Sequence, residues 1–161
     1  MGNEKRIEML EFLIGCPRSG KSTYCVKCIN SIVIEFDEIR RLLHNSVYSQ
    51  YGELMTKSHG LLMAQMLIKQ GHNTILDDTF TSEYNCRSVF KIDPKAKATW
   101  IPNFDTYKCP SNLSLFVKVC QDRAKQLGQD YLVPVIFRTA MQAHELADKY
   151  GENLDALRIN K

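Results

Sequence analysis

Nine consecutive residues decide the fold: Gly15, Cys16, Pro17, Arg18, Ser19, Gly20, Lys21, Ser22 and Thr23. They match the pattern G-x-x-x-x-G-K-[ST], whose glycines let backbone N–H groups turn inward around phosphate oxygens. A mostly apolar run, Met9 to Ile14, precedes the motif, and a helical stretch, Lys21 to Asn30, follows it. This order of strand, loop and helix predicts that the nine residues form a nucleotide-binding loop. Lys21 is expected to reach the β- and γ-phosphates, and Ser22 to hold Mg²⁺.

Three further short apolar runs indicate strands of a parallel sheet, since each is bounded by turn or polar residues. They are Ile32 to Phe36, Asn73 to Leu76 and Ala98 to Ile101. The helical patterns between and after them are Glu38 to His44, Glu53 to Gln70, Ser82 to Phe90, Leu113 to Gly128 and Pro134 to Tyr150. In the second of these helices, Met55, Leu62 and Met66 fall on one apolar face. The alternation predicts an α/β fold with a central parallel sheet of about four strands and helices on both faces.

The chain length of 161 residues predicts one domain over residues 1–161, with the polar tail 151–161 a candidate for fraying. The net charge of +3 permits a polyanionic partner without requiring one. No apolar run is long enough to cross a bilayer, and the polar start, Met1 to Glu8, is unlike a secretory signal. We therefore expect a cytoplasmic protein that does not associate with membranes.

The six cysteines are expected to be reduced thiols in that compartment. Cys25 and Cys28 form a single CxxC pair, and no second cysteine or histidine pair accompanies it at matching spacing. Because a structural zinc site normally needs such a second pair, packed thiols on a helix are the favoured interpretation.

The residues beyond the loop favour a small kinase over other nucleotide-binding proteins. The Asn-Lys-x-Asp motif usual in GTPases is absent, and large ATPases need a longer chain. Asp37 ends the second expected strand, where a carboxylate can orient an acceptor hydroxyl and accept its proton. Arg40, three residues later, can hold a substrate phosphate or stabilise the transferring charge. Capping of the next helix is the structural alternative for Asp37, and both roles can coexist.

Two adjacent carboxylates, Asp77 and Asp78, follow the third expected strand. Acidic residues at this place in phosphate-loop enzymes support Mg²⁺ through water or bind substrate. Capping of the next helix, together with Thr79 and Ser82, is the alternative. The pattern does not choose between the two aspartates.

Basic side chains near the expected site are candidates for contact with an anionic ligand. They are Arg18, Arg87, Arg123, Lys125 and Arg138. Kinases often close a basic lid over the nucleotide, which excludes water and spreads the charge of the transferring group. We expect this lid at about residues 111–133, with Arg123 as its catalytic arginine. A solvated helix face is the alternative for these side chains.

In their order along the chain, these motifs resemble those of the 5′-kinase domain of phage polynucleotide kinase and its relatives among small phosphate-loop kinases. Residues 15–23 resemble the family's Gly-Cys-Pro-Gly-Ser-Gly-Lys-Ser-Thr, and residues 37–40 resemble its Asp-x-x-Arg. Asp78 and Thr79 resemble its Asp-Thr-Asn element, with Phe80 in place of the asparagine. Arg123, followed by residues 133–134, resembles its lid arginine followed by Val-Pro. The resemblance covers roughly residues 8 to 148.

The resemblance implies a P-loop kinase fold and transfer of the γ-phosphoryl group of ATP to the 5′-hydroxyl of DNA or RNA. It implies that Asp37 is the general base, that Arg40 touches substrate, and that Arg123 closes from the lid. The Asp78–Thr79 element, Arg87 and Arg138 are expected to bind substrate, and Asp77 or Asp78 to support Mg²⁺. The second lid arginine of the family has no counterpart here, and neither does its phosphatase half, because the chain contains no Asp-x-Asp motif.

Other interpretations of the site stay open. The acceptor could instead be a small metabolite, a nucleoside or a hydroxymethylated base in DNA. A nucleotide-binding switch protein is a third possibility, although such a protein has no need of Asp37 with Arg40. The sequence leaves the oligomeric state open.

Overall fold

The computed structural model describes residues 9–158 and is built on a parallel sheet of four strands. The strands are β1 (Leu10–Ile14), β2 (Ile32–Glu35), β3 (Thr74–Asp77) and β4 (Lys97–Trp100), in the order β2-β3-β1-β4. The predicted α/β fold with about four parallel strands is therefore confirmed. Since β1 pairs with both β3 and β4, the strand that leads into the loop motif lies inside the sheet.

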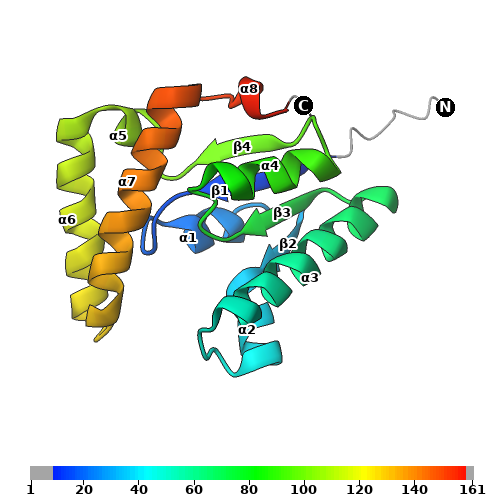
Figure 1. The fold of residues 1–161 in the computed structure, drawn as a ribbon, viewed down its shortest axis with the longest axis horizontal. Helices are drawn as coiled ribbons and strands as arrows, with labels where there is room; N and C mark the ends of the chain where they lie inside the picture. Colours follow the sequence, from blue (N-terminus) through cyan, green and yellow to red (C-terminus); the bar gives the residue numbers. More distant parts are fainter. Residues whose placement is uncertain (1–8, 159–161) are drawn as a thin grey trace.

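The helices connect these strands and then extend the chain past the sheet. They are α1 (Lys21–Val26), α2 (Phe36–His44), α3 (Gln50–Lys69), α4 (Glu83–Ile92), α5 (Phe104–Lys108), α6 (Pro110–Gln126), the 3₁₀ helix η1 (Asp130–Leu132), α7 (Val133–Tyr150) and α8 (Asp155–Arg158). Figure 1 shows α6 and α7 side by side at one end of the molecule, and α2 with α3 at the other. Within residues 9–158, no helix combines the length and the apolar character that crossing a membrane would need.

Helices cover both faces of the sheet, as predicted. Neighbouring residues of a strand point to opposite faces, so β1 contributes to two apolar clusters. Leu13 packs with Cys25 of α1 on one face. On the other face, the Phe12 ring meets the rings of Phe80 and Phe90 edge-on, with centroids 5.5 and 5.4 Å away.

The buried face of α3 is made of small residues. Its members, spaced four apart, are Gly52, Thr56, Gly60 and Ala64. Leu62 and Met66 are more than half exposed, so the apolar face expected from the sequence is not the buried one. The reason why this other face is buried is the contact with α2: a Cβ at Gly60 would lie only 2.4 Å from Cζ of Phe36. Small residues let α2 and α3 approach closely, and the large apolar side chains are left on the outside.

Several element boundaries differ from the sequence-based expectation. Because β2 stops at Glu35 and α2 starts at Phe36, Asp37 lies in the first turn of a helix and does not end the strand. The helix after the loop ends at Val26, before the expected Asn30. The short helix α5 was not expected, and it is capped by Asn103, whose Oδ1 accepts a hydrogen bond from the backbone of Thr106 at 2.9 Å.

Residues 151–158, part of the tail that the sequence marks as a candidate for fraying, pack against the rest of the protein. Leu154 and Leu157 are buried. Nε1 of Trp100 donates to the carbonyl of Glu152 at 2.9 Å, and the Arg158 guanidinium lies 4.4 Å from the centroid of the Phe90 ring. Residues 159–161 lie outside the described part of the chain.

Candidate active site

The loop motif forms the connection between β1 and α1, and its glycines are needed for the turn itself. A Cβ at Gly15 would lie 2.6 Å from Ser19 Oγ and 2.9 Å from the carbonyl oxygen of Ile101. Gly20 has a φ of +105°, a left-handed conformation that glycine adopts without strain. No side chain caps α1 after it, so the first backbone N–H groups of this helix are available to a ligand.

The ammonium group of Lys21 folds back onto the loop. Its Nζ donates to the carbonyls of Gly15 and Cys16 at 3.0 and 2.9 Å. Burial lowers the pKa of Lys21, while the nearby Asp77 carboxylate acts in the opposite direction. Ser19 Oγ is buried and has no hydrogen-bond partner within residues 9–158. A lysine ammonium group held at the loop, beside the cleft, fits the oxygens of a bound phosphate group.

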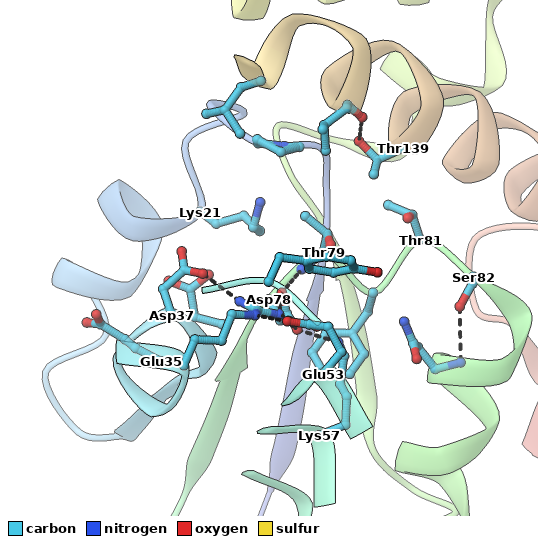
Figure 2. A pocket seen from close by; sticks show the side chains of 18 of the residues that line it. Lys21, Glu35, Asp37, Glu53, Lys57, Asp78, Thr79, Thr81, Ser82 and Thr139 are labelled. Atoms are coloured by element: carbon cyan, nitrogen blue, oxygen red, sulfur yellow. Dashed lines mark hydrogen bonds and ion pairs between the residues drawn. The ribbon is translucent and has the colours of Figure 1, made fainter. Parts of the chain in front are cut away.

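A cleft of about 1820 Å³ lies beyond the carboxyl ends of the strands. Most sequence-predicted site residues line it: Pro17, Arg18, Gly20, Lys21, Ser22, Thr23, Asp37, Arg40, Asp77, Asp78, Thr79, Arg123 and Arg138. Figure 2 shows Lys21, Asp37 and Asp78 gathered at this cleft, with Thr139 of α7 on another side of it. Gly15, Cys16 and Ser19 are buried in the loop beneath.

Two of the basic candidates lie outside the cleft lining. Arg87 donates to Glu83 on its own helix at 2.9 Å, and the other oxygen of Glu83 accepts a hydrogen bond from the Tyr150 hydroxyl at 2.6 Å. This contact joins α4 to α7. Lys125 is exposed on α6 and does not border the cleft.

Arg40 is the centre of an ion-pair cluster formed by α2, α3 and the residue after β3. Its Nη1 lies 2.5 Å from Asp37 Oδ1, and its Nε and Nη2 lie 2.5 and 3.0 Å from the two carboxylate oxygens of Glu53. Nη2 also lies 3.2 Å from Asp78 Oδ2. Burial alone would lower the pKa of Arg40, but the hydrogen bond to Glu53 and the charge of Asp78 raise it. The guanidinium is therefore a permanent, oriented cation.

Asp37 is the most exposed carboxylate of this cluster. Its side chain is 94% exposed, whereas that of Asp78 is only 7% exposed. A carboxylate that is open to the cleft and held by a cation can accept a proton from an acceptor hydroxyl. The buried carboxylate of Asp78 is not open to the cleft in the same way and is not expected to accept this proton.

The structure separates the two neighbouring aspartates that the sequence could not distinguish. Asp78 is bound by Lys57 and Arg40 and accepts from the backbone N–H of Thr79 at 2.8 Å. Although burial acts to raise the pKa of Asp78, these partners, Lys57 foremost, lower it. Burial raises the pKa of Asp77, with Lys21 acting against it. Asp78 thus pairs with Lys57 and Arg40, whereas the charge of Asp77 acts on the pKa of the loop lysine.

Ser22, Asp77 and Asp78, the residues expected to support Mg²⁺, all line the cleft with oxygen atoms, the ligands that Mg²⁺ prefers. The Asp78 carboxylate is already paired with Arg40 and Lys57, which leaves Ser22 and Asp77 of the three. Within residues 9–158, no group of three or more His, Cys, Asp or Glu side chains could hold a metal ion. Mg²⁺ in phosphate-transfer sites is usually held by one or two protein oxygens together with water and substrate phosphates. A small oxygen donor set of this kind is what the cleft provides.

The expected lid, residues 111–133, corresponds to most of α6, a turn at Gly128, and η1. Arg123 of α6 donates through Nη1 to the backbone carbonyl of Arg18 at 3.3 Å. The Arg18 guanidinium in turn donates to Oε1 of Gln129 in the turn. The lid segment therefore touches the loop directly.

Sequence reasoning missed two charged residues of the site, Glu53 and Lys57. Both line the cleft, and Lys57 pairs with Asp78 while lying 4.8 Å from the centroid of the Phe80 ring. Their spacing of four on one helix was the available signal, because such residues share a face. That they face Arg40 and Asp78 depends on how α3 packs.

Sequence reasoning also missed an aromatic lining. Four of the seven tyrosines are between 69% and 80% exposed, and all four border the cleft: Tyr48, Tyr51, Tyr84 and Tyr131. The remaining tyrosines are buried or half-buried.

The cysteines of the CxxC pair, Cys25 and Cys28, are free thiols that pack with Leu13 on the face of the sheet covered by α1. Burial raises the pKa of Cys25 to about 12.

The fold is similar to that of chains in solved structures of an RNA repair assembly. One, from "Structure of the Pnkp1/Rnl/Hen1 RNA repair complex", is 22% identical with a TM-score of 0.71, over 94% of this chain and 49% of that chain. Another, from "Structure of Pnkp1/Rnl/Hen1 complex", is 24% identical with a TM-score of 0.51, over 62% of this chain and 37% of that chain.

The present chain thus spans about half the length of the first of these chains and less of the second. No protein-family model and no curated protein matches the sequence. At these identities the likeness extends to the fold alone: a parallel α/β sheet flanked by helices, compatible with a P-loop fold.

Proposed function

We propose that this chain is an ATP-dependent kinase that transfers the γ-phosphoryl group to the 5′-hydroxyl of a nucleic acid. The observation that carries the proposal is that one cleft is lined by both the Lys21 loop and the Asp37–Arg40 pair. A phosphoryl donor bound at the loop and a hydroxyl acceptor bound at the pair would then meet within one site. The motif resemblance to phage polynucleotide kinase and the fold shared with a chain of an RNA repair complex support this proposal.

The residues that line the cleft suggest a separate role for each in an in-line phosphoryl transfer. The acceptor oxygen attacks the γ-phosphorus, the bond from that phosphorus to the leaving ADP oxygen breaks, and the acceptor proton passes to Asp37. Arg40, held by Glu53, positions the acceptor beside Asp37. Lys21 binds phosphate oxygens, and Mg²⁺ on Ser22 and Asp77, when bound, neutralises phosphate charge. Arg123 reaches the same cleft from the lid.

The acceptor we favour is a nucleic acid because of the tyrosines in the cleft. Exposed aromatic rings provide surfaces on which nucleobases of a single strand stack, at about 1–3 kcal/mol per base. A cleft of about 1820 Å³ also exceeds the roughly 300–1,000 Å³ of a typical small-ligand pocket. It has room for a donor nucleotide together with the end of a polynucleotide.

Phosphoryl transfer from γ-labelled ATP tests the proposal. The wild-type chain and Asp37→Asn are incubated with Mg²⁺ and a single-stranded oligonucleotide bearing a 5′-hydroxyl, as DNA and as RNA. Label on the 5′ end that is lost in the variant supports the proposed reaction. No label despite bound ATP overturns the nucleic acid acceptor and leads to nucleosides, metabolites and hydroxymethylated DNA. No bound ATP overturns the kinase itself.

A further inference from the structure

The arginines of residues 9–158 fall into two groups by their partners. Arg40, Arg41, Arg87 and Arg158 each form an ion pair with a carboxylate. Arg18, Arg123 and Arg138 form no ion pair with any carboxylate in the described part of the chain, and all three line the cleft. Among the arginines of residues 9–158, the charge without a carboxylate partner is thus concentrated where an anionic ligand would bind.

Arg18 is unusual within this group because of its backbone. It has a φ of +65° in the loop motif, a left-handed conformation in which an L side chain is disfavoured and glycine is the ordinary choice. The backbone therefore gains nothing from an arginine at this position. Such backbone conformations cluster at ligand-binding sites, and Arg18 also lines the cleft, unlike Asn45 and Leu154, which share a positive φ.

The contacts of Arg18 leave its charge free for a ligand. Its guanidinium donates to Oε1 of Gln129, a neutral amide that satisfies one hydrogen bond without neutralising the cation. Its carbonyl accepts from Nη1 of Arg123 at 3.3 Å, so two arginines without carboxylate partners adjoin each other. Both border the cleft, Arg18 from the loop that carries Lys21 and Arg123 from α6.

We propose that Arg18 binds the terminal phosphate of the nucleoside triphosphate, exchanging its Gln129 partner for phosphate oxygens. This inference rests on the proposed function and assigns to the loop a second phosphate-binding cation beside Lys21. The planar guanidinium donates in pairs to phosphate oxygens, which a lysine cannot do, and an arginine within the chain is an established way of stabilising charge in phosphoryl transfer.

The test compares the affinities of the variants for ATP and ADP in Mg²⁺ by calorimetry, with no acceptor present. Arg18→Gly is expected to weaken ATP binding about tenfold while changing ADP binding less than about twofold, because only ATP carries the terminal phosphate. Glycine adopts the positive φ without strain, so we expect an unchanged or raised thermal unfolding midpoint. Arg41→Ala, which removes an exposed arginine paired with Glu38, is the matched control and should leave both affinities unchanged.

Gln129→Ala separates phosphate binding from a purely structural latch. If Arg18 serves only to hold the turn, Gln129→Ala should reproduce the losses of Arg18→Gly. If Arg18 binds phosphate, Gln129→Ala should leave ATP affinity unchanged or raise it. Equal losses for ATP and ADP, equal behaviour of the two variants, or no loss in Arg18→Gly would each overturn the proposal. Failure of the wild-type chain to bind ATP would instead overturn the proposed function, and this inference with it.

Discussion

Arg40 of α2 and Glu53 of α3 form a two-point ion pair, with Nε to Oε1 at 2.5 Å and Nη2 to Oε2 at 3.0 Å. The pair is largely buried, since the two side chains are 21% and 24% exposed. It links two helices and fixes the plane of the guanidinium whose other edge contacts Asp37. Glu53 is therefore a positioning residue for the Asp37–Arg40 pair.

Glu53→Gln is expected to lower kcat about tenfold while leaving ATP affinity unchanged, because Arg40 loses one of the anchors that orient it. Steady-state kinetics that separate kcat from KM, with calorimetry for ATP, check this expectation. The matched control is Glu38→Gln, which breaks the exposed pair with Arg41 and should change neither quantity. Weakened ATP binding in Glu53→Gln would contradict a role confined to the acceptor side.

Asp37→Asn is expected to lower kcat by about 10²- to 10⁴-fold, the range typical of losing a general base. ATP affinity should be retained, because Asp37 belongs to α2 and not to the loop. The free energy of unfolding should change by less than about 0.5 kcal/mol, since the side chain is 94% exposed. Kinetics and chemical denaturation measure the two effects, and normal turnover in the variant would rule out Asp37 as the base.

Tyr48→Ala and Tyr51→Ala are each expected to raise the KM for a 5′-hydroxyl oligonucleotide by about 5- to 150-fold, through loss of base stacking. The KM for ATP should be unaffected if these rings contact the acceptor. Phe137→Ala is the matched control, because Phe137 is 56% exposed but does not line the cleft. An equal rise in all three variants would indicate a general surface effect.

Asp77 and Asp78 are expected to affect stability in opposite directions. The folded pKa of Asp78 is lowered from 3.8, so its contribution to stability is present above that value and is lost as the pH falls below it. The folded pKa of Asp77 is raised from 3.8, so the associated stability is present below that value and is lost as the pH rises through the folded pKa. At pH 7, Asp78→Asn should therefore destabilise the fold and Asp77→Asn should stabilise it.

Urea unfolding at pH 7 and at pH 3 measures this difference. Asp78→Asn leaves Lys57 and Arg40 short of a buried anion, so its cost at pH 7 is expected to be about 3–5 kcal/mol and to shrink at pH 3. The gain from Asp77→Asn should disappear at pH 3, where the wild-type carboxyl is largely protonated. Destabilisation by both variants at pH 7 would contradict the distinction.

The sequence by itself determined the parallel α/β architecture, with strands close to their predicted positions, because short apolar runs and turn residues act through near neighbours. It also identified the loop motif, in which local backbone geometry requires Gly20, while the distant carbonyl of Ile101 adds to the constraint on Gly15. The proposed roles of the loop, Asp37 and Arg123 remain predictions for the experiments above.

Tertiary packing decided which candidates meet. The small residues Gly52 and Gly60 let α3 pack closely against α2. The packing of α3 places Glu53 beside Arg40, 13 positions away in the sequence, and Lys57 beside Asp78, 21 positions away. Packing also buried Asp78, left Asp37 exposed, and held the tail through Leu154. The local pattern around each residue carries no information about such contacts, because they depend on how closely distant elements approach one another.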